Sequence, residues 1–249
     1  MPRPWLPADP TPAAIEALLP QIRRGVSRPA PSKLLALWLY LPIELDTANG
    51  RVAYRSSLDA SLRNCREAAD RDANGVRRGA GSGSWLAAMG YLALVDQIGS
   101  AVTNRRPRHQ TPSGRNSFER ALADFTSLNN QEASCLYALR NSLAHGFSLI
   151  NISDARVKDP VRRRLLTRMF TLTRGASGLI EWPAHEWNPS RPHQGGATIV
   201  DVGLLGDLVE ELVRELRVVY AAGDLCIRLE RGRVSPALWR AGRFFVHAV

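Results

Sequence analysis

Residues 136–147 read LYALRNSLAHGF, and this stretch decides how the rest of the chain is interpreted. At about 100° per residue, one narrow helical face collects its apolar side chains, which are Leu136, Leu139, Leu143 and Phe147. Asn141 and His145 are four residues apart and lie together on the side away from that face. Arg140 lies at the edge of the apolar face, where a charge requires a partner, a cleft or an interface. The pattern predicts a core helix that carries a compact polar cluster with one titratable imidazole.

The length and net charge of the chain limit its domain organisation and the kinds of partner that it can bind. With 249 residues it can bury a full core, and one domain with an appended segment is favoured over two equal domains. The net charge of +10 rests on arginine, because only Lys33 and Lys158 are lysines. A positive surface attracts polyanions such as RNA, DNA or acidic proteins, although a solvated basic surface explains the same composition.

Cysteine usage and hydropathy indicate a protein of the cytoplasm. Cys65, Cys135 and Cys226 are far apart and odd in number, which is typical of small buried residues in a reducing compartment. The N-terminus has no signal-peptide layout, and the most apolar windows are too short to span a bilayer. We therefore expect a cytoplasmic protein with no membrane contact, and we expect neither a metal nor a cofactor.

The distribution of prolines and of helical periodicity divides the chain into three parts. Residues 1–56 are expected to form a proline-rich arm, partly docked or flexible, and residues 231–249 a tail with a short helix at Ser235-Pro236. Residues 57–230 are expected to form a helical domain, so the fold class is mainly α. The expected helices cover 57–72, 85–102, 117–128 with Ser117 as N-cap, the segment after Asn129-Asn130, and 204–220.

A change of period after residue 160 indicates strands. The segments 164–173 and 179–187 are separated by Arg174-Gly175-Ala176-Ser177-Gly178, which predicts a small β-hairpin insertion. A further strand is expected at 197–202. The architecture predicted from these patterns is a helical bundle bearing this hairpin.

The polar cluster and its surroundings resemble the HEPN superfamily. The motif Arg140-Asn141-x-x-x-His145, at the end of an amphipathic helix, is similar to the R-x(4–6)-H signature of that superfamily, in which the arginine is often followed by asparagine. The order of two long helices, a loop and a helix pair whose second member carries the motif is also HEPN-like. The resemblance covers about residues 57–225 and implies an HEPN-like helical bundle.

The resemblance implies a metal-independent endoribonuclease, a hydrolase in which the 2′-OH of the RNA attacks the adjacent phosphate. In that reaction His145 would exchange a proton near neutral pH, Arg140 would hold the phosphate oxygens, and Asn141 would orient the imidazole or the phosphate. A single imidazole does not supply both a base and an acid, so the resemblance also implies a homodimer in which two motif helices face one another. By the same analogy the setting is antiphage defence or a toxin–antitoxin-like system with a restraining protein partner.

Other interpretations of the same residues stay open. The trio fits an ordinary helix end, with His145 near the carbonyl dipole and Arg140 in a structural ion pair, for which Glu132 is a candidate partner. An HEPN-like module without catalytic activity would instead bind RNA or a partner protein.

Two basic segments are candidates for an RNA path, with solvated charged faces as the alternative. They comprise Arg105, Arg106 and Arg108 in one segment and Arg162, Arg163 and Arg164 in the other.

Overall fold

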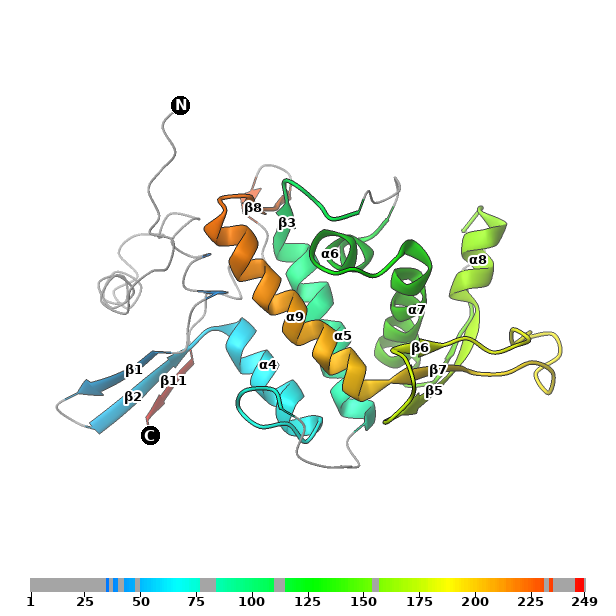
Figure 1. Ribbon diagram of the computed structural model, residues 1–249, viewed down its shortest axis with the longest axis horizontal. Coiled ribbons are helices and arrows are strands. Elements are labelled where there is room, and N and C mark those ends of the chain that lie inside the picture. The colour runs from blue at the N-terminus through cyan, green and yellow to red at the C-terminus, as the bar shows by residue number, and fades with distance from the viewer. Residues whose placement is uncertain are drawn as a thin grey trace. The chain divides into compact units, whose positions relative to one another are not determined.

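The computed structural model of the chain describes residues 35, 38–39, 43–47, 50–76, 84–109, 115–153, 157–230, 233–234 and 245–248 (Figure 1). The described part is mainly α-helical, as the sequence predicts. It falls into two compact units. We call residues 62–99 and 107–213 the motif unit, and residues 1–61, 100–106 and 214–249 the terminal unit.

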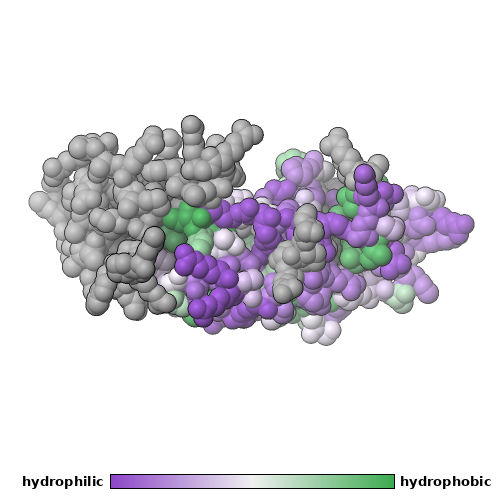
Figure 2. Space-filling model, turned by 90° about the horizontal axis from the view of Figure 1, so that it is seen from above, coloured by the Kyte–Doolittle hydropathy of each residue, from purple (hydrophilic) through white to green (hydrophobic). Residues whose placement is uncertain are grey.

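Five of the following helices form where the apolar periodicity predicts them, and α8 (Pro160–Leu166) forms where part of a strand was predicted. The helices are α4 (Ser57–Ala68), α5 (Ser84–Ala101), α6 (Ser117–Phe125), α7 (Asn130–Gly146), α8 and α9 (Val202–Ala221). Leu62 on α4 and Leu205 and Leu212 on α9 are all buried, as the inner faces of amphipathic helices require. None of the described helices is long and apolar enough to cross a membrane. The described surface visible in Figure 2 is mainly hydrophilic.

Two helix ends differ from the prediction. The N-cap of α6 is Asn116 and not Ser117, because the Asn116 side chain accepts a hydrogen bond from the Glu119 backbone N–H at 2.9 Å. The same helix stops at Phe125, where Thr126 adopts an extended conformation and its hydroxyl donates to the Leu122 carbonyl at 2.6 Å. A local side-chain bond of this kind offers the backbone an alternative to a further helical turn.

The sheet of the motif unit differs from the predicted β-hairpin. Its strands are β4 (Ile150–Asn151), β5 (Arg168–Thr173), β6 (Ile180–Glu181) and β7 (Thr198–Asp201), in the order β4-β5-β7-β6. Strand β7 pairs parallel with β5 and antiparallel with β6. The strands β5 and β6 are therefore not neighbours, and the predicted hairpin of 164–173 and 179–187 is wrong.

Residues 164–166 are helical for a local reason. They form the end of α8, which begins at Pro160 after the N-cap Asp159. The Asp159 side chain accepts from the backbone N–H of Val161 at 2.9 Å, and proline suits the first helical position. An Asp-Pro pair is thus a helix start that the strand interpretation overlooked.

The terminal unit consists of strands and parts of the long helices. Its strands are β1 (Ile43–Thr47), β2 (Gly50–Arg55), β3 (Val102–Asn104), β8 (Leu225–Ile227), β9 (Leu229–Glu230), β10 (Arg233–Val234) and β11 (Phe245–Ala248). They pair antiparallel in the orders β1-β2-β11, β3-β8 and β10-β9.

The terminal unit joins segments that the sequence assigns to different parts. Strand β2 belongs to the predicted arm (residues 1–56) and β11 to the predicted tail (residues 231–249). The two strands pair with each other, so the arm and the tail are not separate parts as the sequence predicted. Strand β3 takes residue 102, where α5 was predicted to continue. The helix expected at Ser235-Pro236 and the arm up to residue 34 lie outside the described residues.

Candidate active site

Helix α7 has a well-defined start that fixes the register of its polar cluster. The side chain of its N-cap Asn129 accepts from the backbone N–H of Gln131 and Glu132, and the Glu132 carboxylate accepts from the Asn129 N–H at 2.9 Å. This reciprocal pair is a capping box. It engages Glu132 at the start of the helix, so the suggested ion pair between Glu132 and Arg140 is wrong.

The apolar face of α7 is confirmed except at its last position. Leu136, Leu139 and Leu143 are at most 1% exposed, and each buried leucine contributes about 1.5–3 kcal/mol relative to exposure. Phe147 was predicted on the same face but is 75% exposed. The helix ends at Gly146, and Phe147 is the C-cap in the left-handed region at φ 44°, which turns it away from the helical position that the pattern assumed.

Arg140 is the centre of the candidate site. One of its terminal nitrogens, Nη2, lies 2.5 Å from Oδ2 of Asp96 on α5. The other, Nη1, lies 3.1 Å from Oδ1 of Asn141 and 2.8 Å from Nε2 of His145. The three motif side chains predicted from the sequence are thus brought together, and the guanidinium links them to a neighbouring helix.

The contact between Arg140 and His145 limits which imidazole nitrogen can carry a proton while the contact is made. A guanidinium only donates hydrogen bonds, so Nε2 of His145 must accept and carry no proton. The ring is then neutral with its proton on Nδ1, an assignment made from the hydrogen bond. An imidazolium cannot make this contact. In this arrangement, the basic nitrogen of the exposed His145 is therefore occupied by a fixed positive charge.

Asp96 is the site residue that the sequence interpretation missed. The helical periodicity of the segment 85–102 gives this residue no particular role. Burying a carboxylate in a largely apolar helix costs free energy unless the carboxylate has a partner. The presence of Asp96 in such a helix was therefore the signal that could have indicated a cationic partner. The Oδ1 atom of Asp96 also accepts a hydrogen bond from the Ser117 hydroxyl at 3.3 Å, so α5, α6 and α7 meet at this residue.

A glycine allows the close approach of α5 and α6 at this point. Gly99 lies one turn after Asp96, and a Cβ placed on it would be 2.0 Å from the carbonyl oxygen of Ser117. Only a residue without a side chain fits there. The position of Asp96 opposite Arg140 thus depends on a small residue that the sequence patterns did not single out.

The six candidate RNA-binding arginines are divided between the two units. Arg105 and Arg106 belong to the terminal unit, where Arg105 Nε lies 2.9 Å from the Cys226 sulfur and Arg106 lies 3.5 Å from Asp224. Arg108 is exposed in the motif unit.

The three arginines of the second basic segment have different interaction partners. Arg162 is held 2.7 Å from Glu119, a carboxylate whose side chain is 2% exposed, so this arginine is structural. Arg163 donates to the Val157 carbonyl at 2.6 Å, and Arg164 lies 3.2 Å from Glu186; both are exposed on α8.

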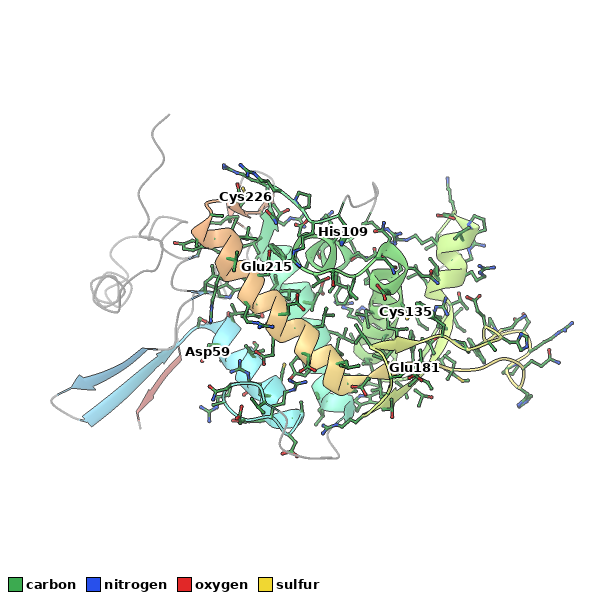
Figure 3. The ribbon with its side chains drawn as sticks, viewed as in Figure 1. Asp59, His109, Cys135, Glu181, Glu215 and Cys226 are labelled. Atoms are coloured by element: carbon green, nitrogen blue, oxygen red, sulfur yellow. The ribbon has the colours of Figure 1, made fainter. Side chains whose placement is uncertain are left out.

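Two of the three cysteines are structural. Cys65 and Cys135 are buried, and burial raises the pKa of each thiol to about 12. Figure 3 labels Cys135 on α7, one and a half turns before Arg140. Among the described residues, no three His, Cys, Asp or Glu side chains lie close enough together to hold a metal ion.

We expect a thiol reagent at about pH 8 to modify Cys226 and to leave Cys65 and Cys135 unmodified until the chain unfolds, because the thiolate is the reactive form. Mass spectrometry of peptides from labelled native and guanidinium-treated protein measures this. Modification of Cys65 or Cys135 as fast as that of Cys226 in the native protein would contradict the burial described above.

Comparison with protein families, with curated proteins and with solved structures finds no match for this chain.

Proposed function

We propose that this chain is a metal-independent endoribonuclease of the HEPN type, with Arg140, Asn141 and His145 as its active residues. The observation that carries the proposal is the convergence of a guanidinium, an amide and an exposed imidazole within hydrogen-bonding distance at the end of α7. This set of groups suits the cleavage of a phosphodiester, because it combines a proton acceptor with a donor that neutralises phosphate charge.

In the proposed reaction, Nε2 of His145 removes the proton from the ribose 2′-OH. The 2′ oxygen forms a bond to phosphorus, the bond from phosphorus to the 5′ oxygen breaks, and that oxygen takes up a proton. The products are a 2′,3′-cyclic phosphate and a 5′-OH. Arg140 offsets the charge that builds on the non-bridging oxygens, and Asn141 orients the imidazole or the phosphate.

Substrate binding must exchange one contact for another. The Nε2 atom of His145 is engaged by Arg140, and it can act as a base only when that contact opens. A phosphate oxygen is a stronger partner for the guanidinium than a neutral imidazole nitrogen. Binding of the phosphate to Nη1 of Arg140 would therefore release Nε2 of His145, while Nη2 of Arg140 stays bound to Asp96.

The proposal includes a homodimer, because the 5′ oxygen needs a proton and each chain brings one imidazole to the site. A twofold axis beside α7 would bring the His145 of the partner subunit to the same phosphate, where this imidazole, protonated and released from its own arginine, would donate the proton to the 5′ oxygen. We further propose a role in antiphage defence or in a toxin–antitoxin-like system with a restraining protein partner, which rests on the HEPN resemblance alone.

We expect purified protein to cleave RNA in excess EDTA, and His145→Ala to lower the rate by a factor of about 10²–10⁴, the usual contribution of a general base. Product ends are identified by their resistance to direct phosphatase removal and by labelling of the new 5′-OH. The matched control is His193→Ala, which removes an exposed imidazole outside the cluster and should cleave as the wild type does.

The second candidate function is a non-catalytic helical module that binds RNA or a partner protein. It is favoured by the internal partners of Arg140, since a guanidinium held by Asp96, Asn141 and His145 is stable without a ligand. The same assay decides between the two. Absence of metal-independent cleavage, with equal RNA binding by wild type and His145→Ala, would favour the module.

A further inference from the structure

Phe147 is an exposed aromatic side chain directly beside the candidate site. It follows His145 by two residues, and consecutive Cα atoms are about 3.8 Å apart, so the Cα atoms of the two residues lie within about 7.6 Å of each other. Among the large apolar residues that the structure describes as exposed, Phe147 has the largest exposed fraction. A phenyl ring in water gains free energy when a flat apolar surface packs against it. The ring is therefore a candidate contact for a ligand of Arg140 and His145.

The backbone of Phe147 holds the ring outside the helix. Its φ of 44° lies in the left-handed region, which large side chains rarely adopt and which costs free energy. Glycine and asparagine are the residues that usually take this conformation at the end of a helix. A helical conformation would place Phe147 on the buried face of α7 beside Leu143. The strained conformation thus exposes a ring that the core would otherwise cover.

Hydrogen bonds fix the segment that carries the ring. The backbone N–H groups of Phe147 and Ser148 both donate to the Ser142 carbonyl, the second at 3.2 Å. The Leu149 carbonyl accepts from the Phe170 N–H of β5 at 2.7 Å. The ring is therefore held in place by a paired backbone before any ligand binds, which lowers the entropic cost of binding.

The neighbouring polar groups indicate which ligand covers the ring. In the proposed reaction Arg140 binds the cleaved phosphate, and each phosphate of an RNA chain is joined to a ribose that carries a flat base. A phosphate at Arg140 therefore brings a base next to the residues that follow His145. Unpaired bases of single-stranded RNA stack on exposed aromatic side chains, so Phe147 has the chemistry that such a base requires.

A second copy of the chain is the alternative occupant, because Ile150 and Ile152 of the same segment are also exposed. The edge of β4 is poorly suited to pairing with a strand of that copy. The Ser148 hydroxyl donates to the Ile150 carbonyl at 2.9 Å and accepts from the Ile150 N–H at 3.1 Å. These backbone groups are already bonded and are not offered to another strand. The charged site beside the ring thus favours RNA.

We propose that Phe147 is the ring on which the base next to the cleaved phosphate stacks in bound RNA. The stack holds that nucleotide while Arg140 binds the phosphate and His145 faces the ribose 2′-OH. Stacking uses the face of the base and not its hydrogen-bonding edges, so all four bases are accepted and any preference follows stacking strength. This role rests on the proposed function, because it places a base of that ribonuclease's substrate.

The test compares wild type with Phe147→Gly, which removes the ring. Glycine suits a positive φ, so this variant should melt at the wild-type temperature or above it. Phe147→Tyr keeps an aromatic ring and is the rescue variant. Val161→Ala, which trims an exposed apolar side chain on α8, is the matched control. Melting temperatures are measured by circular dichroism, and the oligomeric state by analytical ultracentrifugation.

Two fluorescent probes separate base contacts from backbone contacts. The first is a short single-stranded RNA with a 2′-O-methyl group on every ribose, so that it lacks the nucleophile and stays intact. The second has the same sugar-phosphate backbone without bases. Binding of each probe is followed by anisotropy over a range of salt concentrations.

We expect Phe147→Gly to raise the Kd of the probe with bases by a factor of about 5–150, the effect of one lost stack between a base and an aromatic ring. The slope of log K against log salt should not change, because no phosphate contact is lost. Phe147→Gly should bind the probe without bases as the wild type does, since the ring and the base form one contact. Phe147→Tyr and Val161→Ala should bind both probes as the wild type does.

Equal affinity of wild type and Phe147→Gly for the probe with bases would overturn the stack, and so would absence of RNA binding by the wild type. An equal loss of affinity for both probes would also overturn it, because the ring then contacts no base. Dissociation of a dimer in Phe147→Gly would instead assign the ring to a second copy of the chain.

Cleavage in EDTA distinguishes this role from the proposed function. Wild-type cleavage together with unchanged binding by Phe147→Gly would support the nuclease and refute the stack. Base-dependent loss of binding in Phe147→Gly without any wild-type cleavage would refute the nuclease and support the stack.

Discussion

Replacing Arg140 with lysine is expected to lower the rate of RNA cleavage by a factor of about 10²–10³, the usual effect of removing one donor that stabilises transition-state charge. Lysine keeps the positive charge but lacks the planar fork. It cannot hold Asp96 through one nitrogen while it presents a second nitrogen to Asn141, His145 and the phosphate, as Arg140 does. The measurement is kcat/KM on a defined RNA in EDTA.

The control for this change is Arg63→Lys, which alters an exposed i,i+4 ion pair with Glu67 on α4. It should leave both cleavage and the melting temperature unchanged, since exposed pairs of this kind contribute little. Full activity of Arg140→Lys would contradict the role of the guanidinium fork. A loss of melting temperature that accounts for the whole loss of activity would favour the interpretation of Arg140 as a structural ion pair.

The core of the candidate site could be predicted from the sequence because it lies within one helix. Helical periodicity places Leu136, Leu139 and Leu143 inward, and it places Asn141 and His145 on another face. These relations involve residues three or four apart, so they hold wherever the helix forms. The prediction failed at Phe147, where the chain leaves the helix and the periodicity no longer applies.

The remaining parts depend on contacts between distant residues. Asp96 is 44 residues from Arg140, and nothing in local periodicity relates one to the other. The pairing of β5 with β7 is also non-local, because β7 inserts between two strands that sequence order would make neighbours. Sequence patterns identified the polar residues of α7. They did not identify α5 as the helix that supplies the partner of Arg140, and they did not give the order of the strands in the sheet.

Replacing Glu119 with alanine is expected to destabilise the motif unit by about 3–5 kcal/mol, the cost of leaving buried cations without their partner. The Glu119 carboxylate is 2% exposed and forms ion pairs with Arg115 and with Arg162, whose side chains are 11% and 19% exposed. It also accepts a hydrogen bond from Ser134 on α7. Thermal unfolding followed by circular dichroism should show a fall in melting temperature of about 10 °C or more.

Glu67→Ala is the matched control, because it removes a carboxylate of the same kind from a pair in which both side chains are more than half exposed. Its effect should stay within about 1 kcal/mol. Glu119→Gln keeps hydrogen-bond acceptance and should fall between the two. If Glu119→Ala melts like Glu67→Ala, then α8 is not held to α6 and α7 through this carboxylate.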